Sequence, residues 1–200
     1  MAGTTLISTF YNVAPQTLCI MEFKPSKLIL LRQAGRADKQ LEANEKVLKD
    51  TYGKMIDIER AEVMDPYDVQ EVAEKTVKLI EREHKAGSKV ILNVTGGRRT
   101  QMLGALFAAY ARAGMVDRIV YAVDEQNRLV ELPKLDLSPS KKKREVLQML
   151  AKGGHASMSA LAKKLGRTRG MLYVHLRELK EAGYLDEKYG LTTAGRLALL

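Results

Sequence analysis

Cysteine is almost absent from this sequence, and two common localisation signals are missing. Cys19 is the single cysteine among 200 residues, which excludes an internal disulfide, and its neighbours do not have the spacing of a zinc site or a cysteine nucleophile. The first residues lack a basic segment before an apolar stretch, and no apolar run reaches the roughly 18 residues that span a bilayer. We therefore expect a cytoplasmic protein with no membrane partner, in which Cys19 is a small buried apolar side chain.

Motifs for the common nucleotides and for metals are missing as well. No segment matches GxxxxGK[ST], and TFYNVA, which follows the first apolar run, lacks the glycines of GxGxxG. His84, His155 and His175 lie far apart in the sequence, so their spacing supports neither a metal site nor a catalytic one. We predict no metal ion, no cofactor and no catalytic residue.

Positive charge is concentrated in the last third of the chain. Residues 1–137 carry 20 basic and 19 acidic side chains, whereas residues 138–200 carry 13 and 5. The segment LPKLDLSPSKKKRE, with two prolines and a basic cluster, lies where the composition changes. We predict one domain over residues 1–135 and a second over residues 136–200.

Short apolar runs alternate with helical patterns in the first domain. Apolar runs at 4–9, 27–32, 55–63, 89–94 and 118–124 predict strands. Between them, Val72, Ala73, Thr76 and Ile80 share one helical face, and Leu41 and Leu48 do the same in an earlier segment. Alternating strands and helices predict an α/β fold with a Rossmann-like, mostly parallel sheet.

A ligand of such a sheet binds at the carboxyl ends of the strands. The segment NVTGGRRT, residues 93–100, follows the fourth predicted strand and begins a helix. Gly96 and Gly97 allow positive φ and close backbone approach, and the helix start with Arg98 and Arg99 favours an anion. The alternative is a purely structural strand-to-helix turn, which a Gly-Gly pair alone does not exclude.

The helix that follows this turn is apolar on nearly every face. Met102, Leu103, Leu106, Phe107 and Tyr110 surround it, so more than one of its sides has to be buried. We expect one side on the sheet and another on a second copy of the chain, and burial within the domain is the alternative.

The last 65 residues have the pattern of a winged helix-turn-helix. Three amphipathic helices, a short hairpin and a closing helix are predicted, and the third helix turns Leu172, Leu176 and Leu179 inward. Its other face and the preceding helix carry the predicted DNA contacts, which are Arg167, Thr168, Arg169, Tyr173, Arg177, Lys163 and Lys164. The excess positive charge favours double-stranded DNA as the partner over a protein.

Together, the STFYN loop, NVTGGRRTQM and the basic winged helix resemble the CRISPR-associated Rossmann-fold (CARF) transcriptional regulators of archaeal CRISPR systems. The resemblance covers essentially the whole chain and implies a homodimer with cyclic oligoadenylate, in particular cyclic tetra-adenylate, as its effector ligand. Carried over by position, the implied ligand-binding residues are Thr9, Phe10, Tyr11, Asn12, Gly35, Arg36, Thr95, Gly96, Gly97, Arg98 and Arg99. Two alternatives stay open: slow cleavage of the cyclic ligand, and a constitutive repressor or scaffold whose pocket holds another nucleotide.

Overall fold

Two compact units, the first and second domains, make up the chain. They comprise residues 1–136 and 137–200, a division one residue from the predicted boundary. The structure is a computed structural model that describes residues 3–35, 38–123, 126–135, 139–153 and 157–199.

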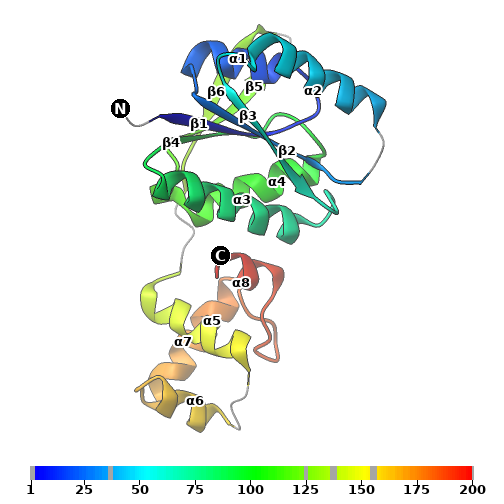
Figure 1. The fold of residues 1–200 in the computed structure, drawn as a ribbon. Coiled ribbons are helices and arrows are strands. Elements are labelled where there is room, and N and C mark those ends of the chain that lie inside the picture. Colours follow the sequence, from blue (N-terminus) through cyan, green and yellow to red (C-terminus); the bar gives the residue numbers. More distant parts are fainter. Residues whose placement is uncertain (1–2, 36–37, 124–125, 136–138, 154–156, 200) are drawn as a thin grey trace. The chain divides into compact units, whose positions relative to one another are not determined.

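A six-stranded sheet with the order β3-β2-β1-β4-β5-β6 forms the centre of the first domain (Figure 1). Strands β1 to β5 pair in parallel, and β6 is antiparallel to β5. The elements are β1 (Thr4–Thr9), α1 (Ala14–Phe23), β2 (Lys27–Gln33), α2 (Lys39–Tyr52), β3 (Asp57–Val63), α3 (Val69–Lys85), β4 (Lys89–Asn93), α4 (Arg99–Ala111), the 3-10 helix η1 (Ala113–Met115), β5 (Arg118–Val123) and β6 (Arg128–Leu132). The strand order therefore reverses between β1 and β4, which is where ligands of doubly wound sheets bind.

Helices cover both faces of the sheet. Figure 1 shows α1 and α2 on one face and α3 and α4 on the other. On the first face, Cys19 and Ile20 of α1 and Leu48 of α2 join strand residues in one apolar core. On the second face α4 packs so tightly on α3 that a Cβ on Gly104 would lie 2.7 Å from Cβ of Val72.

The predicted α/β class and mostly parallel sheet are confirmed. All five predicted strands are present with ends within two residues, and Leu41, Leu48, Val72, Ala73, Thr76 and Ile80 are buried as expected. Cys19 is also buried, and burial raises the pKa of its thiol to about 12. Three elements of the first domain were not predicted, namely α1, the short 3-10 helix η1 and β6. Helix α1 has a continuous apolar run in place of a helical period and no side-chain cap, and β6 is a short, partly exposed edge strand.

The second domain is a winged helix-turn-helix, as predicted. Its helices are α5 (Lys141–Lys152), α6 (Met158–Lys164), α7 (Arg169–Glu181) and α8 (Thr193–Leu197), and an antiparallel bridge between Leu185 and Leu191 closes the wing. Leu172, Leu176 and Leu179 of α7 are fully buried, which confirms the predicted inner face. Ser157 caps α6 by accepting a hydrogen bond from the backbone N–H of Ala160.

Candidate functional site

The turn between β4 and α4 explains why the sequence has two glycines there. A Cβ on Gly96 would lie 2.4 Å from the carbonyl oxygen of Thr9, so only glycine lets this turn lie against the loop after β1. Gly97 has φ of +79°, a backbone conformation that other residues adopt only with strain. Together these glycines bring the start of α4 beside the end of β1, at the reversal of strand order.

The N-terminus of α4 differs from those of α2 and α3. Asp38 and Asp68 cap α2 and α3 by accepting hydrogen bonds from backbone N–H groups. Helix α4 has Arg98 at its N-cap, no side-chain cap and no acidic residue in its first turn. Its free N–H groups and the positive end of its dipole therefore reinforce the charges of Arg98 and Arg99, an arrangement suited to an anion.

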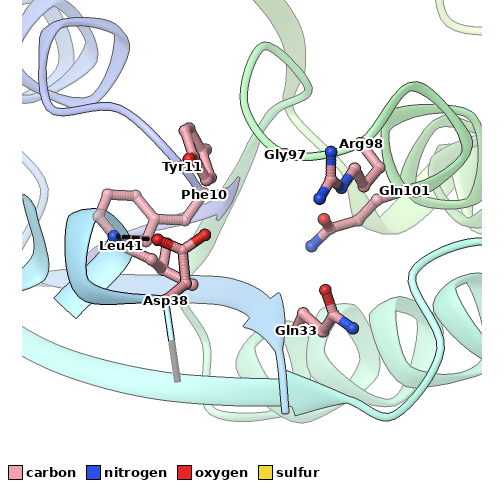
Figure 2. A pocket seen from close by; sticks show the side chains of 8 residues that line it. All are labelled: Phe10, Tyr11, Gln33, Asp38, Leu41, Gly97, Arg98 and Gln101. Atoms are coloured by element: carbon pink, nitrogen blue, oxygen red, sulfur yellow. Dashed lines mark hydrogen bonds between the residues drawn. The ribbon is translucent and has the colours of Figure 1, made fainter. Parts of the chain in front are cut away.

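A pocket of about 290 Å³ opens beside this turn (Figure 2). Its lining residues come from the loop after β1, the end of β2, the start of α2 and the β4–α4 turn, and they are Phe10, Tyr11, Gln33, Asp38, Leu41, Gly97, Arg98 and Gln101. Figure 2 shows Tyr11 and Asp38 on one side of the opening and Arg98 and Gln101 on the other. The pocket therefore has a basic wall from α4 and an acidic group from α2.

Four of the predicted ligand-binding residues line this pocket, namely Phe10, Tyr11, Gly97 and Arg98. Sequence reasoning missed the other four, Gln33, Asp38, Leu41 and Gln101. Asp38 carried a usable signal, because an aspartate three residues before the first inward leucine is typical of a helix cap. Gln101 carried none: its amide donates to the carbonyl of Leu31 at 2.8 Å, a contact that depends on the packing of α4 against the sheet.

The remaining predicted residues do not line the pocket. Thr9 and Gly96 are buried and Thr95 is half-buried, at the ends of β1 and β4. Asn12, Arg99 and Gly35 are exposed, and Gly35 has φ of +68°. Arg36 lies outside the described residues. The roles of all these residues in binding stay predictions.

A buried polar network holds the loops after β1 and β4 together. The amide of Asn93 donates to the hydroxyl of Ser8 at 3.0 Å, and its oxygen accepts the hydroxyl of Thr95 at 2.5 Å. On the other side of Ser8, the amide of Gln16 donates to its hydroxyl at 2.9 Å and to the carbonyl of Thr9 at 3.1 Å. These bonds fix the two loops before any ligand arrives.

An ionic cluster fixes the position of α2 at the other wall of the pocket. Arg32 of β2 is nearly fully buried and contacts Glu45 at 2.7 Å and Glu42 at 2.5 Å, and Arg60 of β3 contacts Glu45 at 3.0 Å. Burial opposes ionisation of Glu45, but hydrogen bonds from Lys49, Arg32 and Arg60 outweigh it and lower its pKa to about 2. The cluster therefore stays ionised and holds α2, with Asp38 at its start, against the sheet.

Arg98 also contacts an aromatic ring outside the pocket. Its guanidinium carbon lies 5.8 Å from the ring centroid of Tyr67, a cation–π distance. The loop that carries Tyr67 is held by the hydroxyl of Thr100, which donates to the carbonyl of Pro66 at 2.7 Å. The hydroxyl of Thr100 therefore bonds to the protein backbone. The ring of Tyr67 restricts the orientation of the Arg98 side chain.

In the second domain the predicted DNA contacts fall into two groups. Arg169, Tyr173 and Arg177 project from α7, and Tyr173 and Arg177 line a groove of about 360 Å³ that reaches Tyr189 in the wing. Arg167 is different: its side chain is 9% exposed and its guanidinium contacts Glu145 at 2.5 Å and the carbonyl of Lys142 at 2.8 Å. Thr168 caps α7 through its hydroxyl.

Lys163 and Lys164 end the helix before α7, and neither forms an ion pair with a described residue. They and the α7 residues leave a basic face for a polyanion, whereas Arg167 and Thr168 hold the turn between the two helices.

Family comparisons agree with both domains. Residues 8–128 match the family described as HFX_2341_N-like, N-terminal, and residues 139–186 match the winged helix-turn-helix DNA-binding family HTH_24. The chain belongs to the HFX_2341_N-like family. Its second domain is of the winged helix-turn-helix DNA-binding type. No curated protein matches the chain.

Solved structures share the fold at low sequence identity. Can2 from Sulfobacillus thermosulfidooxidans in complex with cyclic tetra-adenylate matches 75% of this chain and 44% of its own, at 18% identity and a TM-score of 0.52. Enterococcus italicus Csm6, bound to cyclic hexa-2'-fluoro-hexa-dAMP, matches 92% and 57%, at 13% identity and a TM-score of 0.53.

A type III CRISPR defence DNA nuclease activated by cyclic oligoadenylate matches 66% of this chain and 20% of its own, at 18% identity and a TM-score of 0.50. The chain thus spans less than two thirds of each of these relatives. The likeness of the first domain to these CRISPR-associated proteins is therefore one of fold. The order of the two domains follows from the two family matches.

The described residues show neither a metal-binding cluster nor a membrane-spanning helix. They hold no group of three or more histidine, cysteine, aspartate or glutamate side chains that could bind a metal ion, and His155 lies outside them. No helix among them is long and apolar enough to cross a membrane.

Proposed function

We propose that this protein is a homodimeric, ligand-responsive regulator that binds a cyclic oligoadenylate in its first domain and double-stranded DNA through its second. The observation that carries the proposal is the uncapped, doubly basic start of α4 beside the pocket, in the same chain as a basic winged helix. Two structural relatives have cyclic oligonucleotides bound in their structures, which supports this class of ligand.

The outer face of α4 supports a dimer. Ala105, Ala108 and Ala109 are fully buried against the domain. The larger side chains of the helix, Met102, Leu103, Leu106, Phe107 and Tyr110, are only partly covered, and Leu103 is 38% exposed. Two copies packed about a two-fold axis through this face would cover it and present the basic turn twice to a ring that is itself two-fold symmetric.

Calorimetric titration with cyclic tri-, tetra- and hexa-adenylate tests the ligand. We expect the wild type to bind one of these rings, and Arg98→Ala combined with Arg99→Ala to weaken that binding about 100-fold or more, because two charge-assisted contacts are lost. Lys75→Ala with Lys78→Ala is the matched control, since it removes two positive charges of the same domain away from the pocket. Binding of none of the rings would refute the proposed ligand.

Light scattering with and without the ligand tests the dimer. We expect twice the chain mass for the wild type and dissociation when Leu103→Glu places a charge on the outer face of α4. A wild-type monomer in the presence of saturating ligand would contradict the two-fold site.

Slow cleavage of the ring is the second candidate function. Tyr11 and Arg98 lie on opposite walls of the pocket, where they can orient a ribose hydroxyl toward its phosphate and stabilise the developing charge (Figure 2). Incubation of labelled ligand with the protein for hours, followed by chromatography, decides between the candidates. Intact ligand supports a regulator that only binds, and linear product supports cleavage.

A further inference from the structure

Asp38 and Asp68 are two helix caps of the same kind in different surroundings. Oδ1 of Asp38 accepts from the backbone N–H groups of Gln40 and Leu41, both at 3.1 Å. Oδ1 of Asp68 accepts from Gln70 and Glu71 at 2.9 and 3.1 Å. Asp38 lines the pocket and Asp68 does not.

The helix cap uses only one of the two carboxylate oxygens of Asp38. Among the described residues no donor hydrogen-bonds to Oδ2, and no lysine or arginine forms an ion pair with Asp38. Figure 2 shows this oxygen turned toward the opening, on the side opposite Arg98. An ionised carboxylate only accepts hydrogen bonds, so this oxygen repels phosphate and attracts an N–H or O–H group.

The two walls of the pocket are therefore suited to different chemical groups of one ligand. The α4 wall, with Arg98 and free backbone N–H groups, suits a phosphate. The α2 wall, with Oδ2 of Asp38, suits a neutral hydrogen-bond donor. A simple anion satisfies the first wall and conflicts with the second, whereas a nucleotide satisfies both.

We propose that Asp38 determines specificity by accepting a hydrogen bond from a donor on the nucleotide, either the exocyclic amino group of adenine or the 2'-hydroxyl of ribose. The proposal rests on the proposed function and adds what selects the nucleotide within it. A site built to hydrogen-bond a donor rejects the analogue that lacks it, because the polar group of the site is then left unpaired.

Asp38→Asn in the full-length protein is the decisive variant. Asparagine caps a helix about as well as aspartate, so α2 keeps its start, while an amide that can present an N–H donor replaces the free acceptor. We expect the affinity for cyclic tetra-adenylate to fall about 10- to 100-fold, the range for a lost hydrogen bond to a charged group. Asp68→Asn is the matched control and leaves the affinity unchanged.

Two analogues of the ring identify the donor. The cyclic tetranucleotide of purine riboside has a hydrogen in place of the adenine amino group, and cyclic tetra-2'-deoxyadenylate lacks the hydroxyl. If the amino group is the donor, the wild type prefers the adenylate ring to the purine ring and Asp38→Asn does not. If the hydroxyl is the donor, the wild type discriminates against the deoxy ring and Asp38→Asn does not.

Two outcomes overturn this role. In the first, the Asp38→Asn variant melts at the wild-type temperature and binds cyclic tetra-adenylate as tightly as the wild type or more tightly. That result shows that the carboxylate accepts no hydrogen bond from the ligand. Asp38→Ser, which also caps a helix, gives the same decision if the asparagine variant is unstable. Absence of binding by the wild type overturns both the proposed ligand and this role, whereas wild-type binding with an unaffected variant overturns only the role of Asp38.

Discussion

The two domains use their arginines differently. In the first domain Arg32, Arg60, Arg82 and Arg112 contact glutamates, whereas Arg98 at the pocket and Arg99 beside it form no ion pair with a described residue. In the second domain basic residues outnumber acidic ones 13 to 5 over residues 138–200, and Arg169 of α7 forms no ion pair with a described residue. Whether an arginine can bind a ligand therefore depends on its carboxylate neighbours more than on the net charge.

The largest difference between the two domains is expected for the loss of stability caused by a glycine-to-alanine substitution. Gly96→Ala places a Cβ 2.4 Å from the carbonyl oxygen of Thr9. Because this oxygen belongs to the backbone and cannot easily move aside, we expect a loss of about 3 kcal/mol in the free energy of unfolding. Gly183→Ala in the second domain has positive φ just after α7 but its Cβ meets nothing within 4 Å, so about 1 kcal/mol is expected. Denaturant unfolding measures both, and equal losses would contradict the tight contact between the β1 and β4 loops.

Removing exposed arginines tests whether the second domain, and not the first, binds DNA. Arg169→Ala with Arg177→Ala should weaken duplex DNA binding about 100-fold, about 2.7 kcal/mol, and lower the slope of log affinity against log salt by ~2. Arg98→Ala with Arg99→Ala removes the same charge from the first domain and should leave that slope unchanged. Fluorescence anisotropy at several salt concentrations gives the slopes, and an equal effect of both pairs would refute α7 as the DNA-reading helix.

Acid should destabilise the first domain before the second. The pKa of Glu45 in the folded state is about 2, below its ordinary value of 4.5, so its stabilising contribution is complete above pH 4.5 and is lost as the pH falls toward 2. Glu59 and Glu83, whose pKa values are also lowered, act in the same direction. We expect a loss of about 2 kcal/mol in the first domain between pH 5 and 3. Calorimetric melting across this range checks it, and a constant melting temperature would show that the cluster is not tightly paired.

The smallest effect is expected for the arginine that is already engaged. Arg167→Ala removes contacts to Glu145 and to the carbonyl of Lys142, so we expect about 1 kcal/mol less stability of the second domain. The salt slope of DNA binding should stay within experimental error of the wild type. A slope reduced as much as by Arg169→Ala alone would show that Arg167 leaves Glu145 to contact DNA.

Sequence reasoning predicted most of the fold because periodicity and composition are local properties. The five strands, the buried faces of α2, α3 and α7 and the domain order all follow from apolar spacing. It failed for α1, whose apolar residues are continuous, and for β6, whose edge position leaves little pattern. At the site, sequence reasoning singled out Gly97 and Arg98, which line the pocket in the structure, because the special backbone freedom of glycine and the charge of arginine are visible in the sequence. Their role in binding stays a prediction.

The sequence by itself determined the fold class, the basic second domain and the turn on which α4 begins. The tertiary structure alone decided that Asp38 shares a pocket with Arg98, that Gln101 contacts Leu31, that Gly96 lies against the β1 loop and that Arg167 is held by Glu145. The physical reason is distance along the chain. Each of these contacts joins residues that are far apart in the sequence, and only the packing of strands and helices determines which of them meet.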